Sequence, residues 1–144
     1  MSNRATAAFV FCITGAAYQL TSLFVAAVLD RNTSFYLYNF GYETLFFTSF
    51  IVIWSASHIL EEWKGRITWP SIILGMGFAN LFIIILSYYS QISSPVFLPS
   101  NTPSAAAISS LIAGPLLVVI GGILGLSAVR QYSREHARTV VAHP

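Results

Sequence analysis

The sequence predicts an all-α membrane protein, a bundle of four transmembrane helices, and three observations support this prediction. Only 8% of the 144 residues are charged, whereas soluble domains carry about 25% charged residues. The mean hydropathy is +0.70. Long stretches of the chain contain no charge, and they provide the runs of about 20 apolar residues that spanning helices need. A bilayer, not water, is therefore the expected solvent.

The first two predicted helices cover about residues 5–29 and 36–62. Residues 5–29 carry no charge, and this run is longer than the apolar part of a signal peptide, which has about 7–15 residues. We therefore expect it to remain as a membrane span. Residues 44–60 are also uncharged. Tyr36, Tyr38 and Tyr42 precede them, as is typical of the boundary between lipid and water.

The last two predicted helices, about 70–90 and 104–130, come from one uncharged stretch that covers residues 67–129. That stretch is too long for one span. Pro95, Pro99 and Pro103 lie in the segment that divides it, and proline does not continue a helix. We expect residues 1–144 to form a single integral membrane domain, with residues 131–144 as a cytoplasmic tail.

The distribution of lysine and arginine predicts the orientation. Only Arg31 falls in the first or third predicted loop. The other six basic residues lie on the opposite side, and they are Arg4, Lys64, Arg66, Arg130, Arg134 and Arg138. Because loops rich in lysine and arginine stay in the cytoplasm, both termini are expected there, in a multi-pass protein of the cell membrane.

Small and polar residues recur along the predicted helices at spacings of three and four. Such seams allow close approach of helices in lipid, and their average spacing of about 3.5 residues predicts left-handed packing. The seam of the first helix is Ala8, Cys12, Gly15, Gln19, Ser22 and Ala26, and that of the second is Gly41, Thr44, Thr48, Ile51, Ser55, His58 and Glu62. The third helix has Ser71, Gly75 and Ala79, and the fourth has Ser110, Gly114, Gly121, Gly125 and Ala128.

Two amides lie near the middle of their spans. Gln19 belongs to the first predicted helix and Asn80 to the third, and both helices run from inside to outside. We expect the two side chains at similar depth, as an interhelical hydrogen-bonded pair. In the alternative interpretation they line a transport path together with Glu43, which the helix length places near the outer interface, hydrated or paired with Arg31.

His58, Glu61 and Glu62 lie at the inner end of the second predicted helix. Their spacing puts the imidazole on one face with both carboxylates, which is the arrangement needed by a metal site or an acid–base pair. Two carboxylates in a last helical turn oppose the helix dipole. The preferred interpretation is therefore an ion-pair collar, in which Lys64, Arg66 or other cations neutralise the acids.

Arg130, Arg134 and Arg138 recur every four residues after the fourth predicted helix. They are the second source of cations for the ion-pair collar. The same stripe is also a candidate site for anionic lipid headgroups, although lipid-binding clusters usually contain about 4–8 basic residues.

These observations favour a non-catalytic membrane protein that acts by helix packing, as an accessory subunit or a homo-oligomer. The expected partners are the lipid bilayer and other membrane chains or a second copy, with anionic lipids as a further possibility, and no nucleic acid, metal or cofactor is expected. The one cysteine leaves no CxxC pair. Two alternatives remain: a small oligomeric transporter or channel, and a membrane enzyme that uses His58 and Glu61 at the cytoplasmic face.

Overall fold

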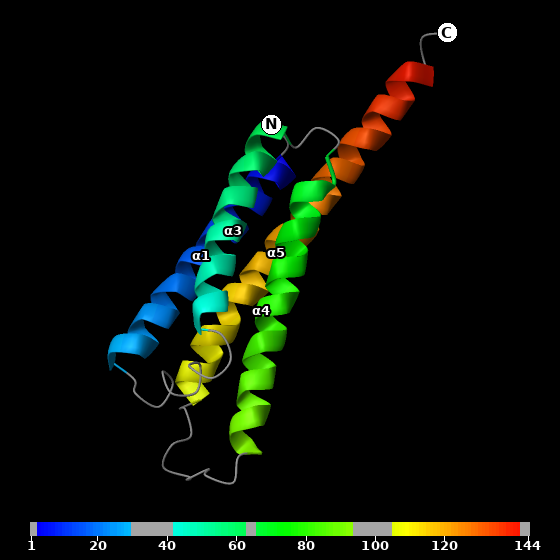
Figure 1. Cartoon of the computed structure of the whole chain (residues 1–144). Helices are drawn as coiled ribbons and strands as arrows, with labels where there is room; N and C mark the ends of the chain where they lie inside the picture. The colour runs from blue at the N-terminus through cyan, green and yellow to red at the C-terminus, as the bar shows by residue number, and fades with distance from the viewer. Residues whose placement is uncertain (1–2, 30–41, 63–65, 94–104, 142–144) are drawn as a thin grey trace.

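The computed structural model describes residues 3–29, 42–62, 66–93 and 105–141. In these residues the chain forms four helices, α1 (Asn3–Leu29), α3 (Tyr42–Glu62), α4 (Thr68–Ile92) and α5 (Ala105–Val141) (Figure 1). Each of them is long and apolar enough to cross a membrane. The prediction of an all-helical protein with four potential membrane spans is therefore confirmed.

The helix boundaries differ from the predicted ones mainly in α5. This helix continues through Pro115 and past the predicted end at residue 130, to Val141. Two side-chain pairs one turn apart, Gln131–Glu135 and Tyr132–His136, support the extension. The 37 residues of α5 span about 55 Å, more than the about 40–45 Å of a whole bilayer. The first residues of the second predicted helix, 36–41, lie outside the described residues.

The four helices form a closed ring. α1 packs against α3 and α5, and α4 packs against the same two neighbours, so α3 and α5 lie diagonally opposite each other. Figure 1 shows that α5 projects beyond the other helices at the end where α1 begins. Large apolar side chains such as Phe24, Phe47 and Phe82 point outwards, with 62–67% of their surface exposed. A surface of exposed apolar side chains, unlike that of a soluble protein, is suited to lipid.

Glycines bring α5 close to both of its neighbours. A Cβ atom on Gly114 would lie 2.9 Å from the backbone oxygen of Gly15 in α1. On the other side of α5, a Cβ atom on Gly122 would lie 3.0 Å from the Cα atom of Leu74 in α4. Because a backbone atom cannot rotate away, any side chain at these two positions forces the neighbouring helices to shift apart.

The predicted seams of α1 and α5 lie largely inside the bundle. Ala8, Cys12, Gly15 and Gln19 are buried in α1, where Ser22 is half-buried. The side chain of Ala26 lies outside the described residues. In α5 the buried members are Gly114, Gly121, Gly125 and Ala128, and Ser110 is half-buried.

The predicted seam of α4 is wrong, because Ser71, Gly75 and Ala79 are all exposed. The buried face is instead formed by Pro70, Ile73, Gly77, Asn80, Ile84 and Ser87. The first set recurs every four residues, and the second recurs at spacings of three and four. A pattern of small residues marks a face suited to helix contact, but it does not say whether the contact is inside the same chain.

The predicted seam of α3 is partly wrong. Thr48 and Ser55 are buried and His58 is half-buried, but Thr44 and Ile51 are exposed. Gly41 and the side chain of Glu62 lie outside the described residues. The buried face includes larger apolar residues that a search for small ones omits, namely Leu45, Val52 and Ile59.

Candidate functional site

A hydrogen-bonded cluster joins three helices in the middle of the bundle, and we call it the amide cluster (Gln19, Thr48 and Asn80). Asn80 Nδ2 donates to Gln19 Oε1 at 3.2 Å, and Thr48 Oγ1 donates to Asn80 Oδ1 at 2.8 Å. Gln19 Nε2 donates to the carbonyl oxygen of Leu45 at 3.2 Å. The structure thus brings Gln19 and Asn80 together across the bundle.

The amide cluster forms a polar layer between two apolar layers. Towards one end the core contains Ala16, Val52 and Ile73, and towards the other it contains Leu23, Leu45 and Ile84. Gln19 and Asn80 are at most 1% exposed. Each bond of this kind contributes on the order of 0.6 kcal/mol in a membrane protein. A one-turn slip of any of the three helices breaks the bonds, so the cluster fixes their register.

Glu43 does not join the amide cluster. It lies in the first turn of α3 and is exposed. A carboxylate at this position is stabilised by the positive end of the helix dipole. Its predicted partner Arg31 lies outside the described residues. The structure therefore separates Glu43 from the two amides that were predicted to share a transport path with it.

His58 is part of an aromatic cluster that connects α3 to α4. Its ring stacks on Trp69 with 4.4 Å between the centroids and 13° between the planes, and it meets Trp54 edge to face at 5.1 Å. The side chains of Glu61 and Glu62 lie outside the described residues. Among the residues that the structure describes, no three His, Cys, Asp or Glu side chains are grouped to hold a metal.

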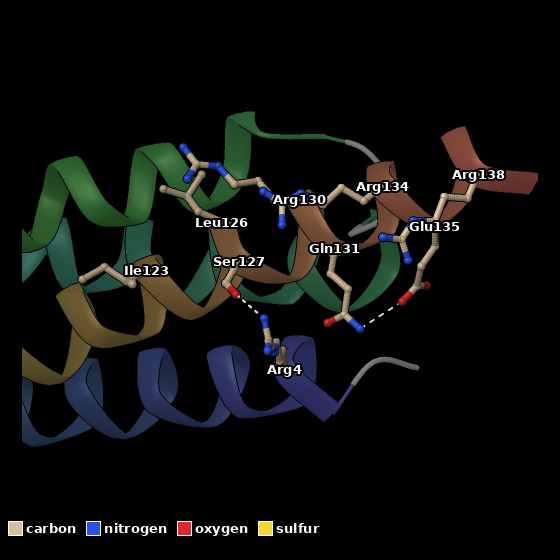
Figure 2. A pocket seen from close by; sticks show the side chains of 9 residues that line it. All are labelled: Arg4, Ile123, Leu126, Ser127, Arg130, Gln131, Arg134, Glu135 and Arg138. Atoms are coloured by element: carbon tan, nitrogen blue, oxygen red, sulfur yellow. Dashed lines mark hydrogen bonds between the residues drawn. The ribbon is translucent and has the colours of Figure 1, made fainter. Parts of the chain in front are cut away.

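The basic residues Arg130, Arg134 and Arg138 lie on the exposed part of α5 and line a cavity of about 630 Å³ together with Arg4 of α1 (Figure 2). We call it the arginine cavity. Arg4 Nη1 donates to Ser127 Oγ at 2.7 Å, which holds the start of α1 beside α5. In the sequence, Arg4 indicated only the orientation of the chain. The one sequence signal that Arg4 could join the arginines of α5 was its predicted position on the same side of the membrane.

The predicted ion-pair collar joins Glu61 and Glu62 to Lys64 and Arg66 nearby or to the arginines of α5. It stays a prediction, because Lys64 and the side chains of both acids lie outside the described residues. The described acid beside the arginine stripe is Glu135, on α5 itself. Its Oε1 atom accepts a hydrogen bond of 2.9 Å from Gln131. The arginine cavity thus contains its own acid.

On the outside of the bundle, Ser71, Gly75 and Ala79 form a row of small, exposed residues along α4, which we call the α4 outer stripe. The large side chains of Phe78 and Phe82, which are one helical turn apart, lie along one side of it and are 56% and 62% exposed. A Cβ atom on Gly75 would meet nothing within 4 Å. Each of the other glycines in the described residues would bring a Cβ within 3.1 Å of a neighbouring helix.

The amide cluster is directed inward and connects three helices. The arginine cavity and the α4 outer stripe face outwards. No protein-family model, curated protein or solved structure matches this chain.

Proposed function

We propose that this protein is a structural subunit of a membrane assembly, which acts by packing the α4 outer stripe against a transmembrane helix of a second copy. The observation that carries this proposal is the open space at Gly75. In a helix interior, glycine costs about 0.5–1 kcal/mol relative to alanine. Inside the bundle that cost is offset by close helix contact, whereas at Gly75 nothing in the described part of the chain offsets it.

The chemistry of the α4 outer stripe favours another helix over a solute. Ser71, Gly75 and Ala79 recur every four residues, which is the small-xxx-small spacing that lets two helix backbones approach in lipid. The stripe contains no charged residue and lies directly opposite the buried face of α4. A helix docked there leaves the packing of the bundle unchanged.

A second copy is the occupant that symmetry favours. Two copies in one membrane share the same topology, so the stripes of two α4 helices meet in parallel with each small residue at the same depth as its counterpart. A two-fold interface requires a surface that is complementary to itself. A row of small residues bordered on one side by Phe78 and Phe82 meets this requirement, because the aromatic rings of one copy can lie against the small residues of the other.

Energy transfer between donor-labelled and acceptor-labelled copies in lipid vesicles tests this proposal. The Gly75→Ile variant places a bulky side chain on the stripe and is expected to weaken association about tenfold, which corresponds to about 1.4 kcal/mol. Ala17→Ile is the matched control, since Ala17 is a small, exposed residue in α1. It is expected to leave association unchanged.

Two outcomes contradict this assignment. If Ala17→Ile weakens association as much as Gly75→Ile does, the interface lies elsewhere. If the copies stay monomeric while Gly75→Ile releases a different chain identified by mass spectrometry, the partner is that chain and not a second copy.

The proposal includes a left-handed bundle in the cell membrane with both termini in the cytoplasm. It is supported by Arg4 and the arginines of α5, which lie at one end of the bundle. Cysteines placed at Asn3 and His143, in a chain that carries Cys12→Ser, report the orientation. Both are expected to react with a membrane-impermeant maleimide only after the cytoplasmic face is exposed. Labelling from opposite sides contradicts an even number of spans.

A further inference from the structure

The arginine cavity lies between the start of α1 and the projecting part of α5 (Figure 2). Its lining combines four arginines with one acid, two neutral polar residues and two apolar residues. They are Arg4, Ile123, Leu126, Ser127, Arg130, Gln131, Arg134, Glu135 and Arg138. The cavity is distinct from the α4 outer stripe, so binding in the cavity does not depend on how the chain self-associates.

The cavity concentrates positive charge. Four guanidinium groups and one carboxylate give its lining a formal charge of +3, which exceeds the +2 of the whole chain. The first turn of α1 also directs the positive end of a helix dipole to this side. Such a site favours an anion. Arginine has a permanently charged, planar group with several donors, which suits the oxygen atoms of a phosphate.

Two separate helices build the site. Arg130, Arg134 and Arg138 follow one another at one turn each along α5. Arg4 comes from α1 and is held beside them by its hydrogen bond to Ser127. The cluster therefore reaches four basic residues, which is the lower limit of about 4–8 found at sites for anionic headgroups.

The apolar end of the cavity distinguishes a lipid from a soluble anion. Ile123 is 53% exposed, and Leu126 is half-buried beside it, towards the middle of α5. From Ile123 to Arg138 the lining extends about 22 Å along the helix, whereas the polar zone on each side of a bilayer is about 5–8 Å thick. The lining is thus longer than the headgroup layer is thick, and its apolar end is the end nearer the middle of the candidate span.

We propose that the arginine cavity binds an anionic phospholipid of the leaflet at this end of the bundle. The phosphate accepts hydrogen bonds from the guanidinium groups of Arg4, Arg130 and Arg134, and an acyl chain lies along Ile123 and Leu126. The bound lipid would then bridge α1 and α5 where α5 leaves the bundle.

Native mass spectrometry of the detergent-purified protein provides the test, with dioleoylphosphatidylglycerol as the anionic probe and dioleoylphosphatidylcholine as its zwitterionic counterpart. We expect phosphatidylglycerol to bind about tenfold more tightly. Arg4→Gln and Arg134→Gln are each expected to weaken its binding about fivefold. Arg66→Gln removes the same charge at the same end of the bundle but outside the cavity, and we expect less than about a twofold loss.

The Arg4 variant is the most decisive test. If the arginines of α5 alone bound the lipid, a substitution in α1 would not lower the affinity for phosphatidylglycerol. Circular dichroism checks that each variant keeps its helical content, and Arg134→Lys, which restores the charge, is expected to recover part of the binding. Equal losses in Arg4→Gln and Arg66→Gln would overturn the proposal in favour of general surface charge. Equal binding of both lipids overturns it in favour of apolar contact alone.

Competition with inorganic phosphate distinguishes a site for a phospholipid headgroup from a site for a soluble phosphate. Added in large excess, it is expected to leave phosphatidylglycerol bound, because it makes no contact with Ile123 or Leu126. If inorganic phosphate displaces the lipid, the site accepts a soluble phosphate and the assignment to a phospholipid is wrong.

Discussion

Replacing Gly114 by alanine tests the close approach of α1 and α5. A Cβ atom at this position would lie 2.9 Å from the backbone oxygen of Gly15 and 3.0 Å from the backbone nitrogen of Gln19. Ordinary contacts of this kind are 3.4–4 Å. Both neighbours are backbone atoms of α1, so no side-chain rotation relieves the clash, and the two helices must separate by several tenths of an ångström.

The expected loss of stability is the balance of two effects. Overpacking of a buried contact costs about 1–3 kcal/mol. Alanine also stabilises a helix interior by about 0.5–1 kcal/mol relative to glycine. Gly75→Ala is the matched control, because it gains the same helix stability and adds its Cβ to open space. The difference between the two variants therefore reports the overpacking together with the steric cost of a Cβ atom directly before Pro115. We expect Gly114→Ala to be about 1–3 kcal/mol less stable than Gly75→Ala.

Reversible unfolding in mixed micelles, followed by circular dichroism, measures this difference. The protein is kept dilute, with one chain per micelle, so that association through α4 does not contribute. If Gly114→Ala is as stable as Gly75→Ala, α1 and α5 do not pack backbone to backbone, and the arrangement of the bundle around α5 is wrong.

Two further predictions concern the polar and aromatic contacts between helices. In a double-mutant cycle of Gln19→Leu and Asn80→Leu, the two losses in unfolding free energy are expected to be non-additive by about 0.6 kcal/mol, and additive losses would show that the amide bond does not form. His58→Phe keeps the stack on Trp69 and is expected to retain stability in the same assay, whereas His58→Ala is expected to lose about 0.5–1.5 kcal/mol. Equal stability of these two variants would contradict a packing role for the ring.

The number and position of the helices were predictable because charge is excluded from the bilayer centre. Uncharged runs and the Pro95–Pro103 segment marked the spans without any knowledge of packing. Counting depth along the first and third spans also put Gln19 and Asn80 at one level, and in the structure they share a hydrogen bond. These inferences needed only the geometry of a single helix and the thickness of the membrane.

Which side of each helix is buried in the bundle was harder to predict. In lipid both sides of a helix are apolar, so the buried side leaves no clear hydrophobic pattern. Ser71, Gly75 and Ala79 therefore resembled the seam of α5, although α4 buries the side that carries Gly77 and Asn80. The seam of α3 was displaced for the same reason, since Leu45 and Val52 are as apolar as the residues that face outwards.

The arginine cavity required a contact between the two ends of the described chain. Arg4 and Ser127 are 123 residues apart, and no local pattern indicates that they meet. The three arginines of α5 were visible in sequence as a stripe. Arg4 joins them only because α1 packs along α5, which places the first turn of α1 beside Ser127.

Oxidative cross-linking in native membranes tests the proposed use of the α4 outer stripe most directly. In a chain with Cys12→Ala, a cysteine is placed at Ala79, and the control carries it at Ala17 instead. A disulfide-linked pair of copies is expected from Ala79→Cys and not from Ala17→Cys. A chain that remains monomeric with Ala79→Cys, or cross-links equally well through Ala17→Cys, contradicts association through α4.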